Sequence, residues 1–427
     1  MSLPRRTFLQ RSLAAGMVAG CATFQKPQRA RAASANEKIV VGVMGLGRGK
    51  GLIQSFAPSE NCHVEYVCDV DSRRLAEGAS LVTKLAGNNP QQVVDVRKIL
   101  DDKKVDALII AAPDHWHAPA TIMACNAGKH VYCEKPTSHN PQEGEWMIAA
   151  ARKHNRVVQI GTQRRSMPVY IEAVKQLQAG AIGKPLLARG YYFNPRPTIN
   201  KGQPAAVPEW LNYDLWQGPA PERDYRDNLV HYNWHWLWHW GTAELGNNGV
   251  HLVDICRWGL GVDHAKTVTC AGGRYRYDDD QQTPDTTVAT FDFGDRAIVW
   301  EARSFYKPIA DDSPTYEIAF YGENGTMTCS QTKLTTYDPA GKKLAEQTFT
   351  AGDLPHIENF LSCVRSGERP NADIEIGHKS TLLCHLGNMA YRTGQTLHID
   401  PNTQKPTSAE AIKLWGREYR DGWKPVV

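Results

Sequence analysis

Two residues that can transfer a proton, Glu134 and Lys135, follow the apolar run His130–Cys133 and precede Pro136. A short apolar run of this kind indicates a buried strand, which the proline ends. In an open parallel sheet, side chains just past the carboxyl end of a strand face the ligand crevice. Burial and nearby cations lower the pKa of a lysine there, so that it can accept the proton of a hydroxyl group. Lys135 is therefore a candidate acid–base group, the alternative being a surface lysine in a turn.

A glycine-rich loop, Gly45-Leu-Gly-Arg-Gly-Lys-Gly51, lies upstream between an apolar run at 38–44 and a helical pattern that begins at Leu52. Strand, glycine loop and helix in this order place a pyrophosphate at a helix N-terminus. The first glycine makes the turn, and the second permits close backbone approach. Lys50 replaces the third glycine of the usual spacing, with a glycine on either side. We expect the loop to contact a dinucleotide through Gly45, Gly47, Arg48 and Gly49.

A second apolar run, His63–Cys68, ends at Asp69, 24 residues after Gly45. An acid at this place can accept hydrogen bonds from both ribose hydroxyls of the adenosine and repels a 2′-phosphate. The sequence therefore favours NAD over NADP as cofactor. Arg73 and Arg74 follow closely and could bind a phosphate instead, which keeps NADP as the alternative.

The elements that must position these residues alternate between apolar runs (106–112, 130–133 and 156–160) and helical patterns (118–127 and 141–154). This alternation predicts an α/β protein whose residues 37–161 form a Rossmann domain with a doubly wound parallel sheet. From 162 to 427 the pattern changes, and short strands with turn signals repeat between 266 and 350. They predict a C-terminal α+β domain with a large, mostly antiparallel sheet. One face of that sheet is expected to pack on helices and the other to form a homo-oligomer interface.

The first 32 residues read as a targeting signal. Arg5 and Arg6 stand before Phe-Leu and a short, weakly apolar run, which resembles a twin-arginine (Tat) export signal and is too short to span a bilayer. A small-x-small cleavage site ends at Ala32, whereas Val18-Ala-Gly-Cys21 resembles a lipoprotein box. We expect a periplasmic or secreted protein that uses the Tat translocon, with a lipid anchor at Cys21 as the alternative.

Composition excludes other classes of partner. Residues 1–32 hold six of the 49 basic residues and no acid, so the rest of the chain has 43 basic and 45 acidic residues. No basic stripe remains, and nucleic acid is not expected as a partner. The ten cysteines form no CxxC pair and lie mostly in apolar runs. They are expected to be buried, without a disulfide framework or a zinc site.

A tryptophan-rich run, His231-Tyr-Asn-Trp-His-Trp-Leu-Trp-His-Trp240, places four tryptophans at a spacing of two. An extended chain would gather these rings on one face. Three interpretations remain open: a buried hydrophobic clamp, a sugar-stacking platform, or a metal site made by His231, His235 and His239. The metal site is disfavoured because no acid or cysteine accompanies these histidines, and we expect no metal.

Together, the glycine loop, Cys68-Asp-Val-Asp71, Ala112-Pro-Asp-His-Trp-His117, Glu134-Lys-Pro136 and Gly161-Thr-Gln-Arg-Arg165 resemble the glucose-fructose oxidoreductase, inositol dehydrogenase and rhizopine-catabolism (Gfo/Idh/MocA) family. The resemblance covers essentially the whole chain after residue 37 and is greatest to the exported branch with twin-arginine leaders. It implies that helix 377–391 packs back between the domains. It also implies contacts to nicotinamide or substrate from Pro113, Asp114, His117, Glu134, Lys135 and Arg164, with Trp-rich insertions beside the site that bring in Trp236 and Trp238.

Members of that family usually carry Asp-x-Gly-x-His where this chain has Asn247-Asn-Gly-Val-His251. The acid is thus Asn247, and the histidine is kept. Residues at i and i+4 share a helix face, so Asn247 and His251 can point at one substrate. We expect Lys135 to take the hydroxyl proton, His251 to hold the substrate oxygen, and the amide of Asn247 to orient His251.

The resemblance implies an NAD-dependent oxidoreductase that moves a hydride between nicotinamide and a secondary alcohol or ketone of a sugar, polyol or glycoside. One alternative is a glycosidase that uses bound NAD for oxidation, elimination, addition and reduction. Family glycosidases lack the lysine after this glutamate, so Lys135 argues against them. A second alternative is a non-catalytic sugar-binding protein, against which intact Lys135 and His251 count.

Overall fold

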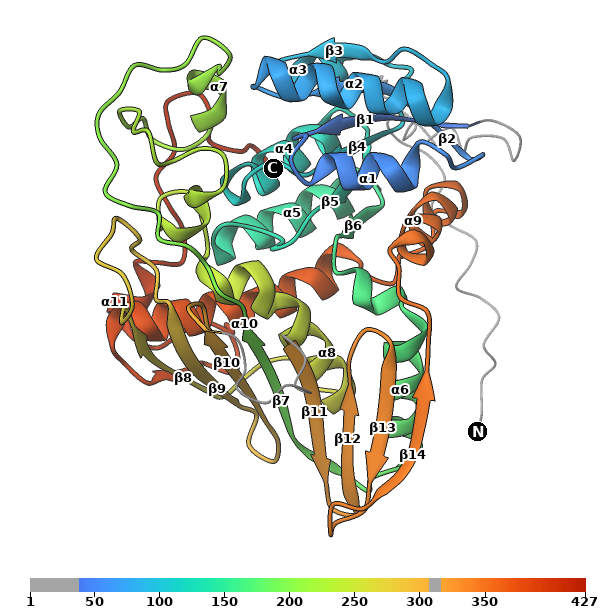
Figure 1. The fold of residues 1–427 in the computed structure, drawn as a ribbon, viewed down its shortest axis with the longest axis vertical. Helices are drawn as coiled ribbons and strands as arrows, with labels where there is room; N and C mark the ends of the chain where they lie inside the picture. The colour runs from blue at the N-terminus through green and yellow to red at the C-terminus, as the bar shows by residue number, and fades with distance from the viewer. Residues whose placement is uncertain (1–37, 307–315) are drawn as a thin grey trace, which may run out of the picture. The chain divides into compact units, whose positions relative to one another are not determined.

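The computed structural model describes residues 38–306 and 316–427, and within them six strands form a parallel sheet in the order β3-β2-β1-β4-β5-β6 (Figure 1). The leader predicted at 1–32, with its alternative anchor at Cys21, lies outside the described residues. Strand order reverses between β1 and β4, which creates the switch point where doubly wound folds bind ligands. The strands are β1 (Ile39–Met44), β2 (Cys62–Cys68), β3 (Gln91–Val93), β4 (Ala107–Ile110), β5 (His130–Cys133) and β6 (Val158–Ile160).

Two separate hydrophobic cores lie against this sheet, one under α1, α2 and α9 and the other under α3, α4 and α5. All four residues of β4 are buried, as expected of a parallel strand covered on both faces. The predicted Rossmann topology is therefore confirmed. The helices are α1 (Gly49–Phe56), α2 (Ser72–Ala86), α3 (Arg97–Asp101), α4 (Asp114–Asn126), α5 (Pro141–Lys153) and α9 (Leu354–Ser366).

A second sheet of nine strands, counted over the described part of the chain, has the order β14-β13-β12-β11-β7-β10-β9-β8-β15. β7 and β10 pair in parallel, and the other neighbours pair antiparallel, so the prediction of a mostly antiparallel sheet is confirmed. The strands are β7 (Pro185–Phe193), β8 (Thr267–Gly273), β9 (Thr286–Asp292), β10 (Ala297–Arg303), β11 (Tyr316–Gly322), β12 (Gly325–Cys329), β13 (Lys333–Tyr337), β14 (Lys343–Thr348) and β15 (Leu397–His398).

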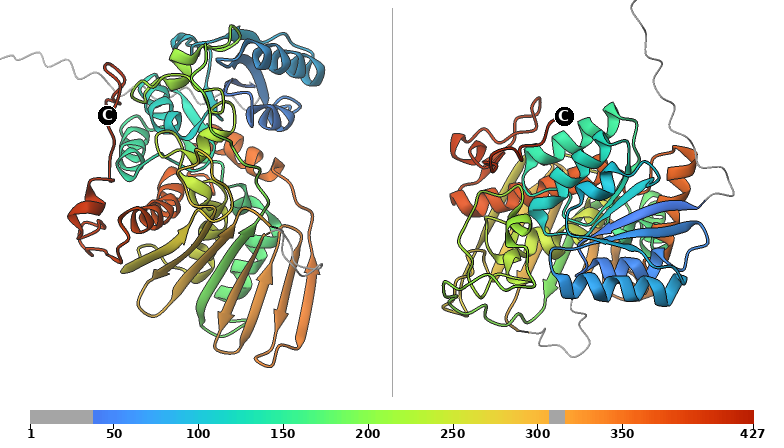
Figure 2. Two further views of the ribbon diagram at one scale, coloured as in Figure 1. Left: turned by 60° about the vertical axis from the view of Figure 1, so that its left-hand side comes forward. Right: turned by 90° about the horizontal axis from the view of Figure 1, so that it is seen from above.

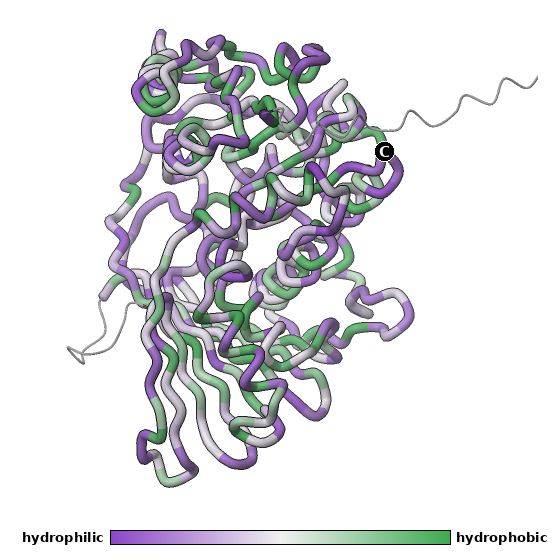
Figure 3. Tube along the Cα trace, turned by 90° about the vertical axis from the view of Figure 1, so that its right-hand side faces the viewer, coloured by the Kyte–Doolittle hydropathy of each residue, from purple (hydrophilic) through white to green (hydrophobic). Residues whose placement is uncertain are grey.

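Burial alternates along β9 and β10, so one face of this sheet is buried and the other is more exposed. Figure 3 shows hydrophobic and hydrophilic residues following one another along the strands. In β10 the buried residues Ile298, Trp300 and Ala302 belong to a core shared with α6 (Pro168–Gln178), α8 (Val250–Leu260) and α10. The opposite face leaves Val288 of β9 and Tyr321 of β11 exposed by 46% and 37%. One face is thus covered by helices, and the other faces solvent in the single chain.

The helix α10 (Ile374–Thr393) contacts α5 and β6 of the N-terminal domain and α8, β8 and β9 of the C-terminal domain. It therefore packs between the two domains, where Figure 2 shows it below the parallel sheet and above the antiparallel one. Asp373 caps its first turn by accepting a hydrogen bond from the backbone of Glu375, and Gly394 ends it in the left-handed conformation.

The long segment 194–241 between β7 and α8 contains the short helices α7 (Tyr213–Gln217) and η2 (Asn233–Trp236) and lies over the N-terminal domain (Figure 1). Its backbone joins the β2–α2 loop, since Ser72 N donates to Trp210 O at 3.0 Å and the Arg73 guanidinium lies 3.5 Å from the Trp210 ring centroid. The segment therefore covers the carboxyl ends of the parallel strands.

The extended conformation considered for residues 231–240 is wrong, because a 3-10 turn occupies Asn233–Trp236. Trp234, Leu237 and Trp240, spaced by three rather than two, join one hydrophobic cluster with Trp216. Packing of this cluster outweighs the period-two pattern of the sequence. The clamp interpretation of the tryptophan-rich run agrees with this burial.

The nine cysteines among the described residues are free thiols, and all but Cys270 are buried, which confirms their prediction as buried hydrophobes. Within residues 38–306 and 316–427, no helix has the length and apolarity needed to cross a membrane.

Candidate active site

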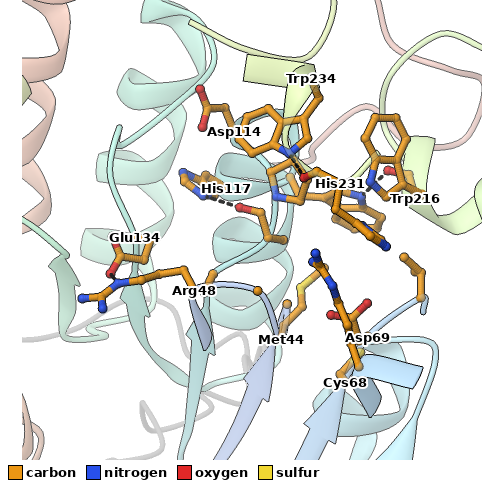
Figure 4. A pocket seen from close by; sticks show the side chains of 18 of the residues that line it. Met44, Arg48, Cys68, Asp69, Asp114, His117, Glu134, Trp216, His231 and Trp234 are labelled. Atoms are coloured by element: carbon orange, nitrogen blue, oxygen red, sulfur yellow. Dashed lines mark hydrogen bonds and ion pairs between the residues drawn. The ribbon is translucent and has the colours of Figure 1, made fainter. Parts of the chain in front are cut away.

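A cavity of about 600 Å³ opens at the switch point between the parallel sheet and the covering segment. Met44, Cys68 and Asp69 line its side toward the strands, and Trp216 and Trp234 lie opposite them (Figure 4). The cavity is thus bounded by the strand ends on one side and by segment 194–241 on the other. Most of the predicted site residues line it, namely Gly45, Gly47, Arg48, Asp69, Pro113, Asp114, His117, Glu134, Lys135, Asn247 and His251.

Four predicted residues do not line the cavity. Gly49 opens α1 beneath the loop, and Arg164 is buried with its guanidinium 5.7 Å from the Tyr170 ring centroid. Trp236 is buried beside Arg196. Trp238 lines a small separate cavity, where the guanidinium of Arg392 lies 5.0 Å from its ring centroid.

Aromatic side chains that the sequence did not single out for the site take the place of these two tryptophans. Trp216, Tyr232 and Trp234 line the cavity. Trp234 belongs to the tryptophan-rich run, so the run itself was the signal, but its conformation decides which ring reaches the cavity. No comparable signal marks Trp216, which is placed by α7.

The glycine loop fits a dinucleotide. Gly45 has φ +86°, and a Cβ there would lie 2.5 Å from the Ala111 carbonyl oxygen, so only glycine is accommodated. A Cβ at Gly47 would lie 3.0 Å from the Arg74 guanidinium, which therefore stands beside the loop. Backbone amides at the start of α1 and this cation suit a pyrophosphate.

Asp69 is fixed at the end of β2, where Leu46 N donates to its Oδ2 at 2.6 Å and Asp71 N to its Oδ1 at 2.9 Å. Burial raises the pKa of Asp69, and these two amides act against that shift. Each carboxylate oxygen keeps a lone pair for a ribose hydroxyl. Arg73 instead donates to Asp71 and stacks on Trp210, so of the two arginines considered for a phosphate only Arg74 lines the cavity.

At the other end of the cavity, Lys135 Nζ donates to the backbone O of Asn247 at 2.6 Å and to its Oδ1 at 3.1 Å. Burial lowers the pKa of Lys135, although the carboxylates of Glu134, Asp114 and Glu244 act in the opposite direction. Asn247 lies on a single turn of π-helix, η3 (Leu245–Gly249), a feature often found at functional sites. Asn247 therefore holds the lysine amine directly.

The expected hydrogen bond from Asn247 to His251 is wrong, because the Asn247 side chain faces Lys135 and Glu244 instead. Nδ1 of His251 is buried and has no hydrogen-bond partner among the described residues. Burial, with smaller effects from Lys135 and Arg164, lowers the pKa of His251 well below its usual value. His251 is a neutral imidazole with hydrogen-bonding capacity left for a ligand.

His117 has an unusual pair of partners. Its Nδ1 lies 2.6 Å from Pro136 O and its Nε2 lies 2.9 Å from Ala112 O. A carbonyl oxygen only accepts, so both ring nitrogens must carry a proton. Burial opposes this charge but is outweighed by Cys133, Asp114 and the Pro136 carbonyl, which raise the pKa of His117 to about 10. His117 is therefore a fixed cation at the ends of β4 and β5.

Glu134 and its neighbour Lys135 have different hydrogen-bond partners. Its Oε1 accepts from Arg48 Nε and Gln163 Nε2, both at 3.1 Å (Figure 4 shows the arginine). The Arg48 guanidinium also donates to Asp353 at 2.7 Å. Glu134 thus links the glycine loop to the end of β5.

The histidines considered for a metal site have separate partners. His231 Nε2 pairs with Asp71 at 2.8 Å, His235 Nδ1 donates to Tyr232 O, and His239 Nε2 donates to Pro221 O. Among residues 38–306 and 316–427, no group of three or more His, Cys, Asp and Glu side chains is arranged to hold a metal ion.

A doubly wound sheet with a glycine loop, an acid after its second strand and a lysine in the same cavity defines a dinucleotide-dependent oxidoreductase. The chain belongs to the Gfo/Idh/MocA oxidoreductase family: residues 39–162 match its NAD-binding Rossmann fold, and residues 175–425 match its C-terminal alpha/beta domain. The predicted family and the predicted cofactor NAD are thereby confirmed.

Two curated relatives act on cyclic polyols or sugars by name. Inositol 2-dehydrogenase of Salmonella typhimurium is 29% identical over 177 residues, which are 41% of this chain and 52% of the relative. Levoglucosan dehydrogenase of Pseudarthrobacter phenanthrenivorans is 39% identical over 167 residues, which are 39% of this chain and 36% of the relative. The chain spans about half the length of the first curated relatives it matches.

A solved structure of levoglucosan dehydrogenase with NADH and levoglucosan is similar to this chain with a TM-score of 0.65 at 19% identity, over 85% of this chain and 99% of that one. At this identity the similarity shows a shared fold.

Proposed function

We propose that the protein is an NAD-dependent dehydrogenase that oxidises a secondary alcohol of a sugar, polyol or glycoside, or reduces the corresponding ketone. The observation that carries the proposal is the position of Lys135, whose partly buried amine lies in the same cavity as the glycine loop and Asp69. The names of the inositol and levoglucosan dehydrogenases support a sugar or polyol as substrate.

The Lys135 amine is prepared to act as a base. A neutral amine has two hydrogens and one lone pair, and the two oxygens of Asn247 can accept both hydrogens. The lone pair is then directed away from Asn247 and is available for the proton of a substrate hydroxyl. Bound NAD would supply the hydride acceptor, held by Gly45, Gly47 and Asp69.

His251 and the aromatic cover complete the site. The neutral imidazole of His251 can hydrogen-bond the substrate oxygen while Lys135 takes its proton. Trp216, Tyr232 and Trp234 line the cavity and reduce its access to water, which strengthens the electrostatic interactions within it.

The test begins with mass spectrometry of the native protein for bound nucleotide, followed by a panel of sugars, polyols and aryl glycosides monitored at the absorbance of reduced nicotinamide. Lys135→Met should lower turnover by a factor of about 10² to 10⁴ and leave nucleotide binding unchanged. Lys129→Met is the matched control, because the amine of Lys129 is likewise held by two oxygens, Asp102 O and Val105 O, but lies away from the cavity. Equal losses in both variants, or release of aglycone without net reduction of NAD, would contradict the dehydrogenase proposal.

We further propose that the chain is exported through the Tat pathway and assembles as a homo-oligomer. Arg5 and Arg6 support the first proposal. The exposed side chains of Val288 and Tyr321 on the uncovered sheet face support the second, because a second copy would bury them. Sedimentation velocity with Val288→Lys tests the interface: the variant should dissociate, and an unchanged assembly would refute this contact.

A further inference from the structure

Glu244 lies one turn before Asn247 and is only 2% exposed. Its Oε1 accepts from Asn247 Nδ2 at 3.4 Å and also from the Asn248 side-chain amide. Arg196 forms an ion pair with it, with Nε 3.2 Å from Oε2 and Nη2 3.2 Å from Oε1. A buried carboxylate thus stands immediately behind the residue that holds Lys135.

The contacts of Glu244 determine which way the Asn247 amide faces. An amide has a donor end and an acceptor end, and a carboxylate only accepts. Because Glu244 accepts from Nδ2, Oδ1 is the end presented to Lys135. If the amide turned over, its NH₂ group would face the amine hydrogens of Lys135, and the second of the two hydrogen bonds of that amine would be lost.

Glu244 also contributes charge. Of the groups that face Lys135, Glu134, Asp114 and Glu244 favour its protonated form and Arg48 opposes it. His235 and His251 are neutral, since burial lowers the pKa of His235 to about 3 and that of His251 well below its usual value. Tyr192 and Tyr232 also face Glu244, and burial raises the pKa of both. Glu244 adds to this rise at Tyr192, whereas Arg196 acts against it at Tyr232.

We propose that Glu244 is a positioning residue for Lys135. It orients the Asn247 amide that holds the lysine amine, and it supplies the negative charge that an acid at position 247 would otherwise provide. The proposal rests on the proposed role of Lys135 as the base. It assigns a function to a residue that does not line the cavity.

The experiment measures acetylation of Lys135 by acetic anhydride against pH, quantified by mass spectrometry in the full-length protein. Removing the negative charge in Glu244→Gln should lower the pH midpoint by about one unit. Glu244→Gln/Asn247→Asp returns the carboxylate to position 247 and should bring the midpoint back to the wild-type value or above it. Glu301→Gln, which breaks the Arg189–Glu301 pair of 2.7 Å on the C-terminal sheet, is the control and should leave the midpoint unchanged.

Glu244→Gln leaves the partly buried Arg196 without its ion-pair partner, so Arg196→Gln/Glu244→Gln, which removes both charges, is measured beside it. Its midpoint should also fall, because Glu244 rather than Arg196 is the group in contact with Asn247. A midpoint unmoved in both variants, or one that fails to return in Glu244→Gln/Asn247→Asp, would overturn the proposal. Labelling needs neither substrate nor turnover, so a wild-type protein without dehydrogenase activity would refute the proposed function while leaving this result readable.

Discussion

The two carbonyl partners of His117 lead to a quantitative prediction about stability and pH. Nδ1 and Nε2 both donate, to Pro136 O and Ala112 O, so the folded protein requires the imidazolium. In the folded state the pKa of His117 is raised from 6.5 to about 10. The resulting stabilisation is fully present below pH 6.5 and is lost as the pH rises through about 10, because the unfolded chain binds fewer protons in this window.

The size of the effect follows from the shift. One pKa unit corresponds to about 1.4 kcal/mol, so at most about 5 kcal/mol is lost over the whole window and about 3 kcal/mol between pH 7.5 and 9.5. His117→Gln removes the titrating group, while its amide can still donate to one carbonyl. The free energy of unfolding of this variant should therefore decline less steeply with pH than that of the wild type.

The assay is denaturant unfolding at several pH values, compared with His115→Gln. His115 lies on the same helix and is buried, but its pKa is lowered well below the usual value, mainly by burial, so it has no proton to lose in this window. ¹⁵N shifts of the histidine rings provide an independent readout and should show His117 doubly protonated at pH 7.5. A neutral His117 ring, or the same slope in wild type and His117→Gln, would refute the reasoning.

Further predictions concern cofactor choice, the covering segment and export. Asp69→Ser should weaken NAD binding by about 30-fold, through loss of hydrogen bonds to a charged acceptor, and shift preference toward NADP; an unchanged NADP to NAD ratio in fluorescence titrations would count against it. Trp210→Ala removes the stack on Arg73 and should speed nucleotide release in stopped-flow experiments, whereas an unaltered rate would mean that the segment does not retain the cofactor. Replacing Arg5 and Arg6 by Lys should keep the protein in the cytoplasm, and its appearance in the periplasmic fraction would refute the Tat assignment.

The parallel half of the molecule and its strand-end residues could be predicted because their signals are local. Buried parallel strands give continuous apolar runs, and the carboxyl ends of such strands meet at one edge of the sheet. Asp69, Asp114 and Lys135 follow three different strands and line one cavity for this reason. The glycine loop could also be predicted from the sequence, because the positive φ of Gly45 and its contact with Ala111 leave no space for a side chain and so require glycine.

The covering segment could not be predicted in the same way, because its conformation depends on contacts distant in the sequence. The spacing of two in the tryptophan-rich run matches a strand. The segment is stabilised more by burying Trp234, Leu237 and Trp240 in one hydrophobic cluster with Trp216. Which tryptophan reaches the cavity follows from that packing. The aromatic lining of the site is therefore a tertiary property that no spacing rule contains.

The acid missing at position 247 shows how a local departure can be compensated within a single turn. From the sequence alone, the loss of the acid at position 247 predicts a lower pKa for Lys135 than in a chain with an acid there. In the fold, Glu244 precedes it by three residues, the spacing at which helical side chains are neighbours, and accepts a hydrogen bond from its amide. The carboxylate of Glu244 thus contacts the Asn247 amide rather than Lys135 itself, and Arg196 partly neutralises its charge. Lys135, which contacts an amide backed by a partly neutralised carboxylate, should lose its proton at a lower pH than a lysine in direct contact with an acid. Asn247→Asp should therefore raise the pH of half-maximal oxidation.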